Sequence, residues 1–295
     1  MIKSVVCSIV LTGAVGFLQG CTSNPVSENV GDALLALEED ATLSFGGSSE
    51  AYEVLEKLAE AFNQTVDGAV DYEFFPPSQT SGGLEGVASQ VFDIGGVSRV
   101  ISVEEVGNTL TYQQLIQVPM VPIANNSVTG VTNISADQLR AIYGGTITNW
   151  LELGGPDADI VVLDFVEDEN EKIILRQAYL GEDFDITMDA IVFPEDDELL
   201  ETAASTAFSF AVVPLEDDIE NLPVNVLSLD NLAPSDENIR AGDYKMIIDL
   251  GMVMQKEPSP AAQLFFEFIS SPAGQAVLFE ESSIEDQGHL FAHSE

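Results

Sequence analysis

From residue 41 onward the chain alternates between short apolar runs and segments of helical periodicity, and this alternation is its most restrictive feature. The runs "ATLSF" (41–45), "VDYEFF" (70–75) and "FDIGGVS" (92–98) have the pattern of strands. After the first run, apolar residues recur at a spacing that puts them on one helical face: Tyr52, Leu55, Leu58, Ala59 and Phe62. Repeated strand, loop and helix units favour an α/β fold with largely parallel strand pairing.

The alternation continues to the end of the chain. Further strands are predicted at 118–125, 159–165, 207–214 and 246–255. Further helices are predicted at 135–145, 172–181, 259–269 and 270–280. Two of these helices carry start signals, because Ser135 suits an N-cap and Ser271 precedes a proline at the first helical position. The helix predicted at 135–145 is expected to end at Gly144 or Gly145.

The charge of the chain is far from balanced. Its 295 residues include 50 acidic and 9 basic ones, for a formal net charge of −41. Hydrophobic residues make up 45% of the chain, which is typical of a folded protein rather than a disordered one. Such a charge weakens a compact state in dilute buffer, whereas about 1 M salt shortens the Debye length to roughly 3 Å. We therefore expect a saline habitat, and we exclude nucleic acid as a partner.

Three acidic runs, at 167–171, 195–198 and 216–220, are predicted to lie in loops. They lack the alternating Asp/Asn-Gly spacing and distal Glu of a calcium loop. Solvated surface is therefore the favoured interpretation, and no metal site is predicted.

The first residues have the pattern of an export signal. A short basic start with Lys3 precedes an apolar run from Val5 to Leu18, which is too short for a permanent membrane span. The sequence Leu-Gln-Gly-Cys that ends at Cys21 resembles a bacterial lipobox, which implies cleavage after residue 20 and lipidation of the cysteine. Residues 21–40 are then a tether. An ordinary secretory signal with an incidental cysteine is the alternative.

The chain has few residues and motifs that are typical of catalysis. The two histidines, His289 and His293, lie in a polar tail, and Cys7 would leave with the signal. No nucleophile elbow, phosphate-binding loop or dinucleotide fingerprint occurs. Nucleophilic chemistry lacks its usual base, so neither an enzyme nor a cofactor is predicted.

Five segments, in order, resemble the PstS-like phosphate-binding proteins of bacterial ABC importers. They are "SFGGSSEAY", "SQTSGGLEGVASQVFDIGGVSR", "ISADQLRAIYGGTITNWLELGG", "LAPSDENIRAGDYKM" and "FFEFISSPAGQAV". The third is the most specific. The resemblance covers residues 41–280, about the whole exported part.

This resemblance implies a type II periplasmic-binding-protein fold, with mixed sheets, helices on both faces and two crossover hinge strands near 115–121 and 244–253. Domain I would comprise 41–118 and 245–295, and domain II would comprise 119–244. The implied function is that of a monomeric, exported and lipid-anchored receptor that binds phosphate or another small oxyanion and delivers it to an ABC transporter permease. The alternative is a cleft that has drifted to another ligand or to a regulatory role.

Hydroxyls and glycines near two predicted helix starts are the candidate ligand-binding residues. Helix N-termini present unpaired N–H groups and partial positive charge, so an anion is held without a cationic side chain. The residues are Gly47, Ser48, Ser49, Thr80, Ser81, Gly82, Gly83 and Ser98. Simple capping of their own helices is the competing interpretation for the hydroxyls.

The expected second half of the site departs from the family. The resemblance implies an arginine and a Ser-Gly-Thr loop after the strand at 159–165, where this chain reads "DFVEDENEK". Lys172 or Arg176 is a possible substitute, although both also suit exposed helix positions. Arg140 is expected in a surface ion pair, Arg99 in ordering the cleft or anchoring a loop, and Trp150 in the core. The acids from Asp164 to Glu171 either face the cleft, where they suit a cationic ligand, or are solvated.

Overall fold

The computed structural model describes residues 41–194, 196–215 and 217–282. The predicted signal, tether and lipidated Cys21, and both histidines, lie outside these residues. None of the helices in the described part is long and apolar enough to cross a membrane.

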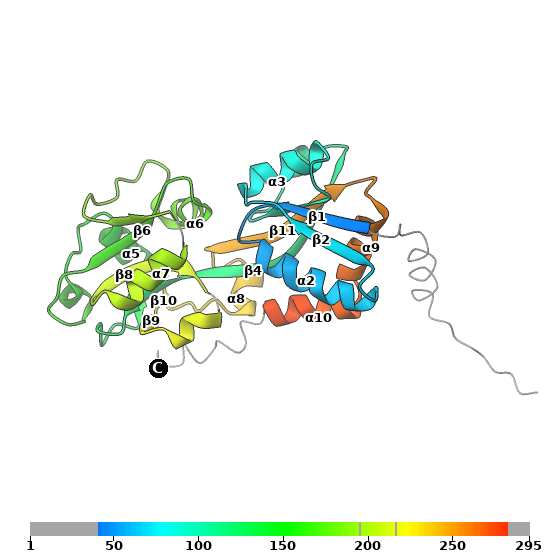
Figure 1. The fold of residues 1–295 in the computed structure, drawn as a ribbon. Helices are drawn as coiled ribbons and strands as arrows, with labels where there is room; N and C mark the ends of the chain where they lie inside the picture. The colour runs from blue at the N-terminus through cyan, green and yellow to red at the C-terminus, as the bar shows by residue number, and fades with distance from the viewer. Residues whose placement is uncertain (1–40, 195, 216, 283–295) are drawn as a thin grey trace, which may run out of the picture. The chain divides into compact units, whose positions relative to one another are not determined.

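Nine strands form one mixed sheet, in the order β2-β1-β3-β11-β4-β8-β6-β7, with β9 paired to β4; β5 and β10 form a separate pair (Figure 1). The strands are β1 (Ala41–Gly47), β2 (Val70–Phe74), β3 (Ile94–Val97), β4 (Leu110–Asn125), β5 (Asn133–Ile134), β6 (Val161–Phe165), β7 (Ile191–Phe193), β8 (Ser209–Pro214), β9 (Val224–Val226), β10 (Ser228–Leu229) and β11 (Ile247–Gln255). Pairing is parallel at both ends of the sheet but antiparallel from β3 through β11 and β4 to β8. The expectation of largely parallel pairing is therefore wrong for the centre.

The central antiparallel strands are the two in which the resemblance places the crossings. β4 pairs with β11 from Leu110 to Pro119 and with β8 from Met120 to Ala124. On either side of these strands the sheet is parallel: β1 pairs with β2 and β3, and β6 pairs with β7 and β8. The described residues form one compact unit in their contacts, and the division into domains near 118 and 245 stays a prediction.

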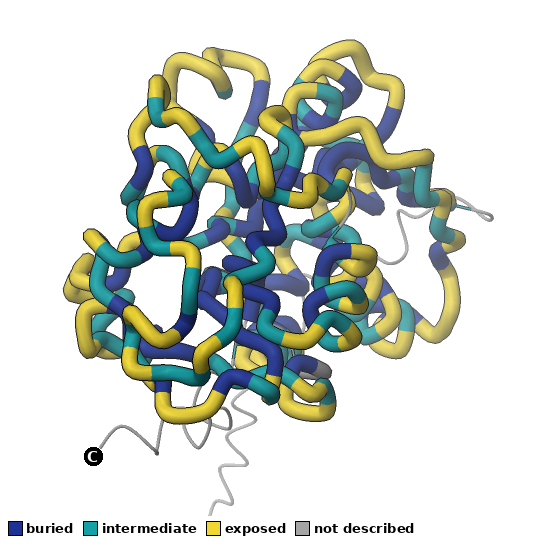
Figure 2. The backbone as a smooth tube through the Cα atoms, turned by 90° about the vertical axis from the view of Figure 1, so that its left-hand side faces the viewer, coloured by how far each residue is buried: buried dark blue, intermediate teal, exposed yellow. Residues whose placement is uncertain are grey.

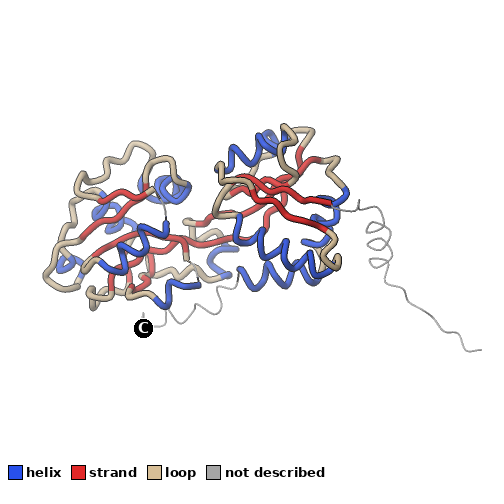
Figure 3. Tube along the Cα trace, in the orientation of Figure 1, coloured by secondary structure: helices blue, strands red, loops and turns tan. Residues whose placement is uncertain are grey.

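Helices connect the strands and cover the sheet (Figure 3). They are α2 (Tyr52–Thr65), α3 (Gln79–Ala88), α4 (Val103–Val106), α5 (Ala136–Tyr143), α6 (Asn170–Leu175), α7 (Asp196–Ser205), α8 (Asp236–Ala241), α9 (Pro260–Ile269) and α10 (Pro272–Glu281). α6 continues as one wider turn from Arg176 to Leu180. Helix α3 lies on one side of β1 and β2, and α2 and α10 lie side by side on the other (Figure 1).

Capping chemistry fixes several of these helix starts as predicted. Ser135 forms a reciprocal capping box with Gln138, and Gly144 ends α5. Ser271 accepts from the N–H of Gly274, with Pro272 at the first helical position of α10. The acidic run at 195–198 was expected in a loop, but α7 begins at Asp196. Acidic residues in a first helical turn are favoured by the helix dipole, which explains the difference.

Buried residues, dark blue in Figure 2, lie mainly in the interior of the molecule. On the α2 side of the sheet, Phe45 stacks on Phe74 at 4.5 Å and meets Phe265 of α9 edge-on at 5.5 Å. On the α3 side a smaller core joins Val87, Phe92, Val97, Ile101, Leu110 and Val253. Aromatic and aliphatic packing on both faces holds the ends of β1 and β3 in fixed positions, and the candidate site lies at those ends.

Candidate functional site

Glycines bring β1, β3 and α3 into direct backbone contact. β1 and β3 are parallel, with Gly47 opposite Gly96. A Cβ at Gly83 would lie 2.6 Å from the carbonyl oxygen of Gly96, and one at Gly47 would lie 2.3 Å from the same atom. The start of α3 therefore sits directly against the carboxyl ends of two parallel strands. In open α/β sheets this is the place where ligands bind.

Thr80 and Ser98 tie α3 to the end of β3. The backbone N–H of Ser98 donates to Thr80 Oγ1 at 3.0 Å, and the two hydroxyl oxygens are 3.2 Å apart. Both side chains are buried. The competing interpretation of Thr80 as a cap of its own helix is wrong, because its hydroxyl reaches the neighbouring strand. Residues 80–83 also belong to α3 itself rather than to a loop before it.

The first turn of α3 supplies the remaining predicted donors. Ser78 is the N-cap residue, but its side chain makes no capping hydrogen bond. Gln79 has a φ of 58°, a left-handed conformation that is unfavourable for a residue with a side chain. Ser81 is exposed and Gly82 is half-buried. The leading N–H groups of a ten-residue helix and the Ser81 hydroxyl together make a suitable cradle for an anion.

Ser48 and Ser49 are already engaged with a carboxylate. The Ser48 hydroxyl donates a short hydrogen bond to Glu50 Oε2, and the Ser49 hydroxyl donates to the same oxygen at 3.3 Å. Ser48 is fully buried, and its N–H donates to the carbonyl of Gly96 at 3.0 Å. The first predicted loop is therefore rigid, with its hydroxyls directed at an acid that directly follows them in sequence.

The segment that replaces the family's Ser-Gly-Thr loop reaches the same site through an amide. Asn170, the first residue of α6, donates from Nδ2 to the carbonyl oxygen of Ser98 at 3.0 Å. Its neighbour Glu171 is only 3% exposed. Burial, and then the negative charge of Glu50, raise the pKa of Glu171 to about 8. Glu171 thus contradicts the expectation of a solvated acidic run, and it holds a proton at neutral pH.

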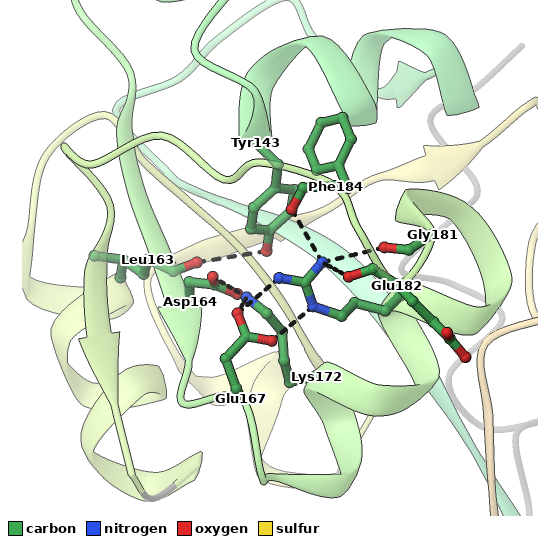
Figure 4. Close-up of polar contacts among 9 residues, drawn as sticks. Tyr143, Leu163, Asp164, Glu167, Lys172, Gly181, Glu182 and Phe184 are labelled. Atoms are coloured by element: carbon green, nitrogen blue, oxygen red, sulfur yellow. Dashed lines mark hydrogen bonds and ion pairs between the residues drawn. The ribbon is translucent and has the colours of Figure 1, made fainter.

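Lys172 is buried and paired, which contradicts its expected exposure on the helix. Its ammonium bonds to the carboxylate of Asp164 on β6, and both side chains are at most 3% exposed (Figure 4). Glu167 lies 3.8 Å from the same ammonium, and Arg176 binds Glu167 through two nitrogens at 2.7 Å each. The two cations proposed as substitutes for the family's arginine are therefore occupied by acids of their own segment.

Three further predicted roles are settled by contacts. Arg99 forms a two-pronged ion pair with Glu105, which caps α4, so it anchors a loop. Arg140 was expected in a surface ion pair, but it donates to the carbonyls of Tyr179 and Leu180 and stacks on the ring of Phe184 at 4.7 Å. Trp150 is fully buried, as predicted, and its Nε1 donates to the carbonyl of Phe208.

Comparison with known proteins places this geometry in a family. The sequence model of the PBP superfamily domain matches residues 35–273. The chain belongs to the PBP superfamily. It is 24% identical over 269 residues to the phosphate-binding protein PstS of Borreliella burgdorferi, covering 86% of this chain and 91% of the relative. It is 27% identical to PstS of Bacillus subtilis, covering 86% and 82%.

A solved structure shares the fold. It is a Clostridium perfringens protein assigned as a phosphate ABC transporter substrate-binding protein, with bound phosphate, and it superposes with a TM-score of 0.69 at 24% identity. The match covers 81% of this chain and 97% of that one. The PBP fold predicted from the five sequence segments is thus confirmed.

The sequence did not reveal the contacts of two residues at the site, Glu50 and Asn170. Glu50 directly follows the serines that it binds, so its proximity was readable, but the direction of its side chain was not. Asn170 stood out as the one amide within an acidic run, yet no sequence signal tells that its side chain reaches Ser98.

Proposed function

We propose that this protein is the solute-binding component of an ABC importer and binds phosphate at the ends of β1 and β3. The observation that carries the proposal is that the start of α3, with Thr80, Ser81, Gly82 and Gly83, lies against the ends of β1 and β3, where Gly47, Ser48, Ser49 and Ser98 are found. The PstS relatives are phosphate-binding proteins, which supports phosphate in particular. Binding proteins of this kind carry out no chemistry on the ligand.

Neutral donors suit an anion-binding protein that is itself strongly acidic. Hydrogen bonds from backbone N–H and hydroxyl groups act at contact distance, whereas the net charge of the surface acts over a Debye length and is screened by salt. In this proposal the two predicted domains, 41–118 with 245–295 and 119–244, bend about β4 and β11 to enclose the ligand. Asn170, which reaches Ser98 from α6, is then a contact that holds the two together.

Export and lipid anchoring at Cys21 belong to the same proposal. They are tested by mass spectrometry of the N-terminus of the protein purified from membranes. A lipid-modified Cys21 at the first position supports the anchor, and an unmodified cysteine contradicts it.

Calorimetric titration of the purified protein with phosphate, sulfate and molybdate at about 2 M salt tests the function. We expect saturable binding of phosphate. Ser81→Ala should weaken it about tenfold or more, because a hydrogen bond to a charged group is worth about 1.5–3 kcal/mol. Ser89→Ala, at the exposed other end of α3, is the matched control. A folded sample that binds no oxyanion would contradict the proposal.

A further inference from the structure

Two hydroxyls of the proposed phosphate site, those of Ser48 and Ser49, already donate hydrogen bonds within the protein. The buried Ser48 hydroxyl and the exposed Ser49 hydroxyl both point to one oxygen of Glu50. The N–H of Ser48 donates to the carbonyl oxygen of Gly96, which fixes the backbone from which the hydroxyl projects. A carboxylate is a planar anion whose oxygens accept hydrogen bonds as those of an oxyanion do. Glu50 therefore occupies the contacts that the proposed ligand needs.

The charge of Glu50 also acts on acids of two other elements. Its charge adds to burial in raising the pKa of Glu171 on α6 and of Asp196 at the start of α7. Asn170 of the same helix α6 reaches the end of β3. The carboxylate of Glu50 is thus bonded to the serine donors, and its charge acts on acids of α6 and α7.

We propose that Glu50 is an internal competitor of the ligand, whose carboxylate takes the Ser48 and Ser49 donors until phosphate displaces it. This inference rests on the proposed function of the site. A second anion cannot share the same donors, because two like charges in contact repel each other. Because the competitor is attached three bonds from the backbone next to its donors, its effective concentration is high, and every oxyanion must overcome the same penalty. Glu50 therefore sets the affinity of the site.

Phosphate titrations of the wild-type protein, Glu50→Ala and Glu50→Gln test this inference. We expect Glu50→Ala to bind phosphate about tenfold to a hundredfold more tightly, which corresponds to release of one charged hydrogen-bonded contact. Glu50→Gln keeps an accepting oxygen without the charge, so it should lie between the other two. Circular dichroism establishes that each variant is folded, and the glutamine variant serves if the alanine variant is not.

Glu60→Gln is the control for net charge, because Glu60 is exposed on helix α2, which begins just after Glu50. Its affinity should equal that of the wild type. Weaker binding by both Glu50 variants would overturn the inference and make Glu50 a ligand contact. Unchanged binding, or equal tightening by Glu60→Gln, would overturn it as well while leaving the proposed function intact. Absence of phosphate binding in all four proteins would overturn the proposed function and this inference together.

Discussion

At the scale of single residues, the buried pair of Lys172 and Asp164 dominates the local energetics. Its ammonium and carboxylate are almost completely removed from water, and Asp164 Oδ1 has no hydrogen-bond partner in the described structure. Lys172→Met would leave the acid buried without a counter-charge. We expect the free energy of unfolding to fall by about 3–5 kcal/mol, as measured by denaturant titration.

The double variant Lys172→Met/Asp164→Leu distinguishes lost charge pairing from lost packing. Replacing both partners by apolar groups is often nearly neutral, so it should recover most of the stability. Lys256→Met removes an exposed lysine and should change stability by less than about 0.5 kcal/mol. A loss in the double variant as large as in the single one would contradict this account.

Glu171 predicts a pH dependence of stability. Its ordinary pKa of 4.5 is raised to about 8 by burial and then by Glu50, with Asp196 and Glu169 adding in the same direction. The folded protein therefore binds a proton more tightly than the unfolded chain. Ionisation of the buried Glu171 therefore lowers the free energy of unfolding. This loss is absent below pH 4.5, grows as the pH rises toward 8, and is constant above that.

Glu171→Gln imitates the protonated form and should remove this slope. We expect the variant to exceed the wild type in unfolding free energy by on the order of 4 kcal/mol at pH 8, and to match it near pH 4.5. The measurement is denaturant titration at both pH values, with Glu85→Gln on the exposed face of α3 as the control. A difference that does not vary with pH would exclude titration of Glu171 as its cause.

At the scale of elements, Gly83 decides how α3 meets the sheet. Alanine normally stabilises a helix by about 1 kcal/mol over glycine. Here the added Cβ would lie 2.6 Å from the Gly96 carbonyl oxygen and 3.2 Å from Gly47 Cα, so the helix must move away from β1 and β3. We expect Gly83→Ala to lose about 2 kcal/mol of stability and all measurable phosphate binding. Thermal unfolding and titration test this, and a stabilised variant with intact binding would contradict it.

The elements were predictable from the sequence to a much greater degree than the site. Hydrophobic periodicity located β1, α2, β6, α9 and most other elements, because burial of one face fixes the period. Serine caps located the starts of α5 and α10. The antiparallel centre of the sheet was missed, because pairing direction depends on the path of the chain through space. Side-chain direction was missed for the same reason at Glu50, Asn170 and Lys172.

At the scale of the whole molecule, the excess of acidic residues predicts that stability depends on salt. With 50 acidic and 9 basic residues, repulsion opposes the compact state more than the expanded one. Added KCl should therefore raise the melting temperature steeply, up to about 1 M, where the Debye length is roughly 3 Å and little repulsion is left to screen. Sucrose at matched osmolality stabilises by exclusion and leaves charges unscreened, so it should give a smaller rise without such a plateau. Equal effects of salt and sucrose would mean that repulsion does not limit this fold. In that case, screening of the surface charge would not explain how the neutral donors of α3 hold an anion on so acidic a protein.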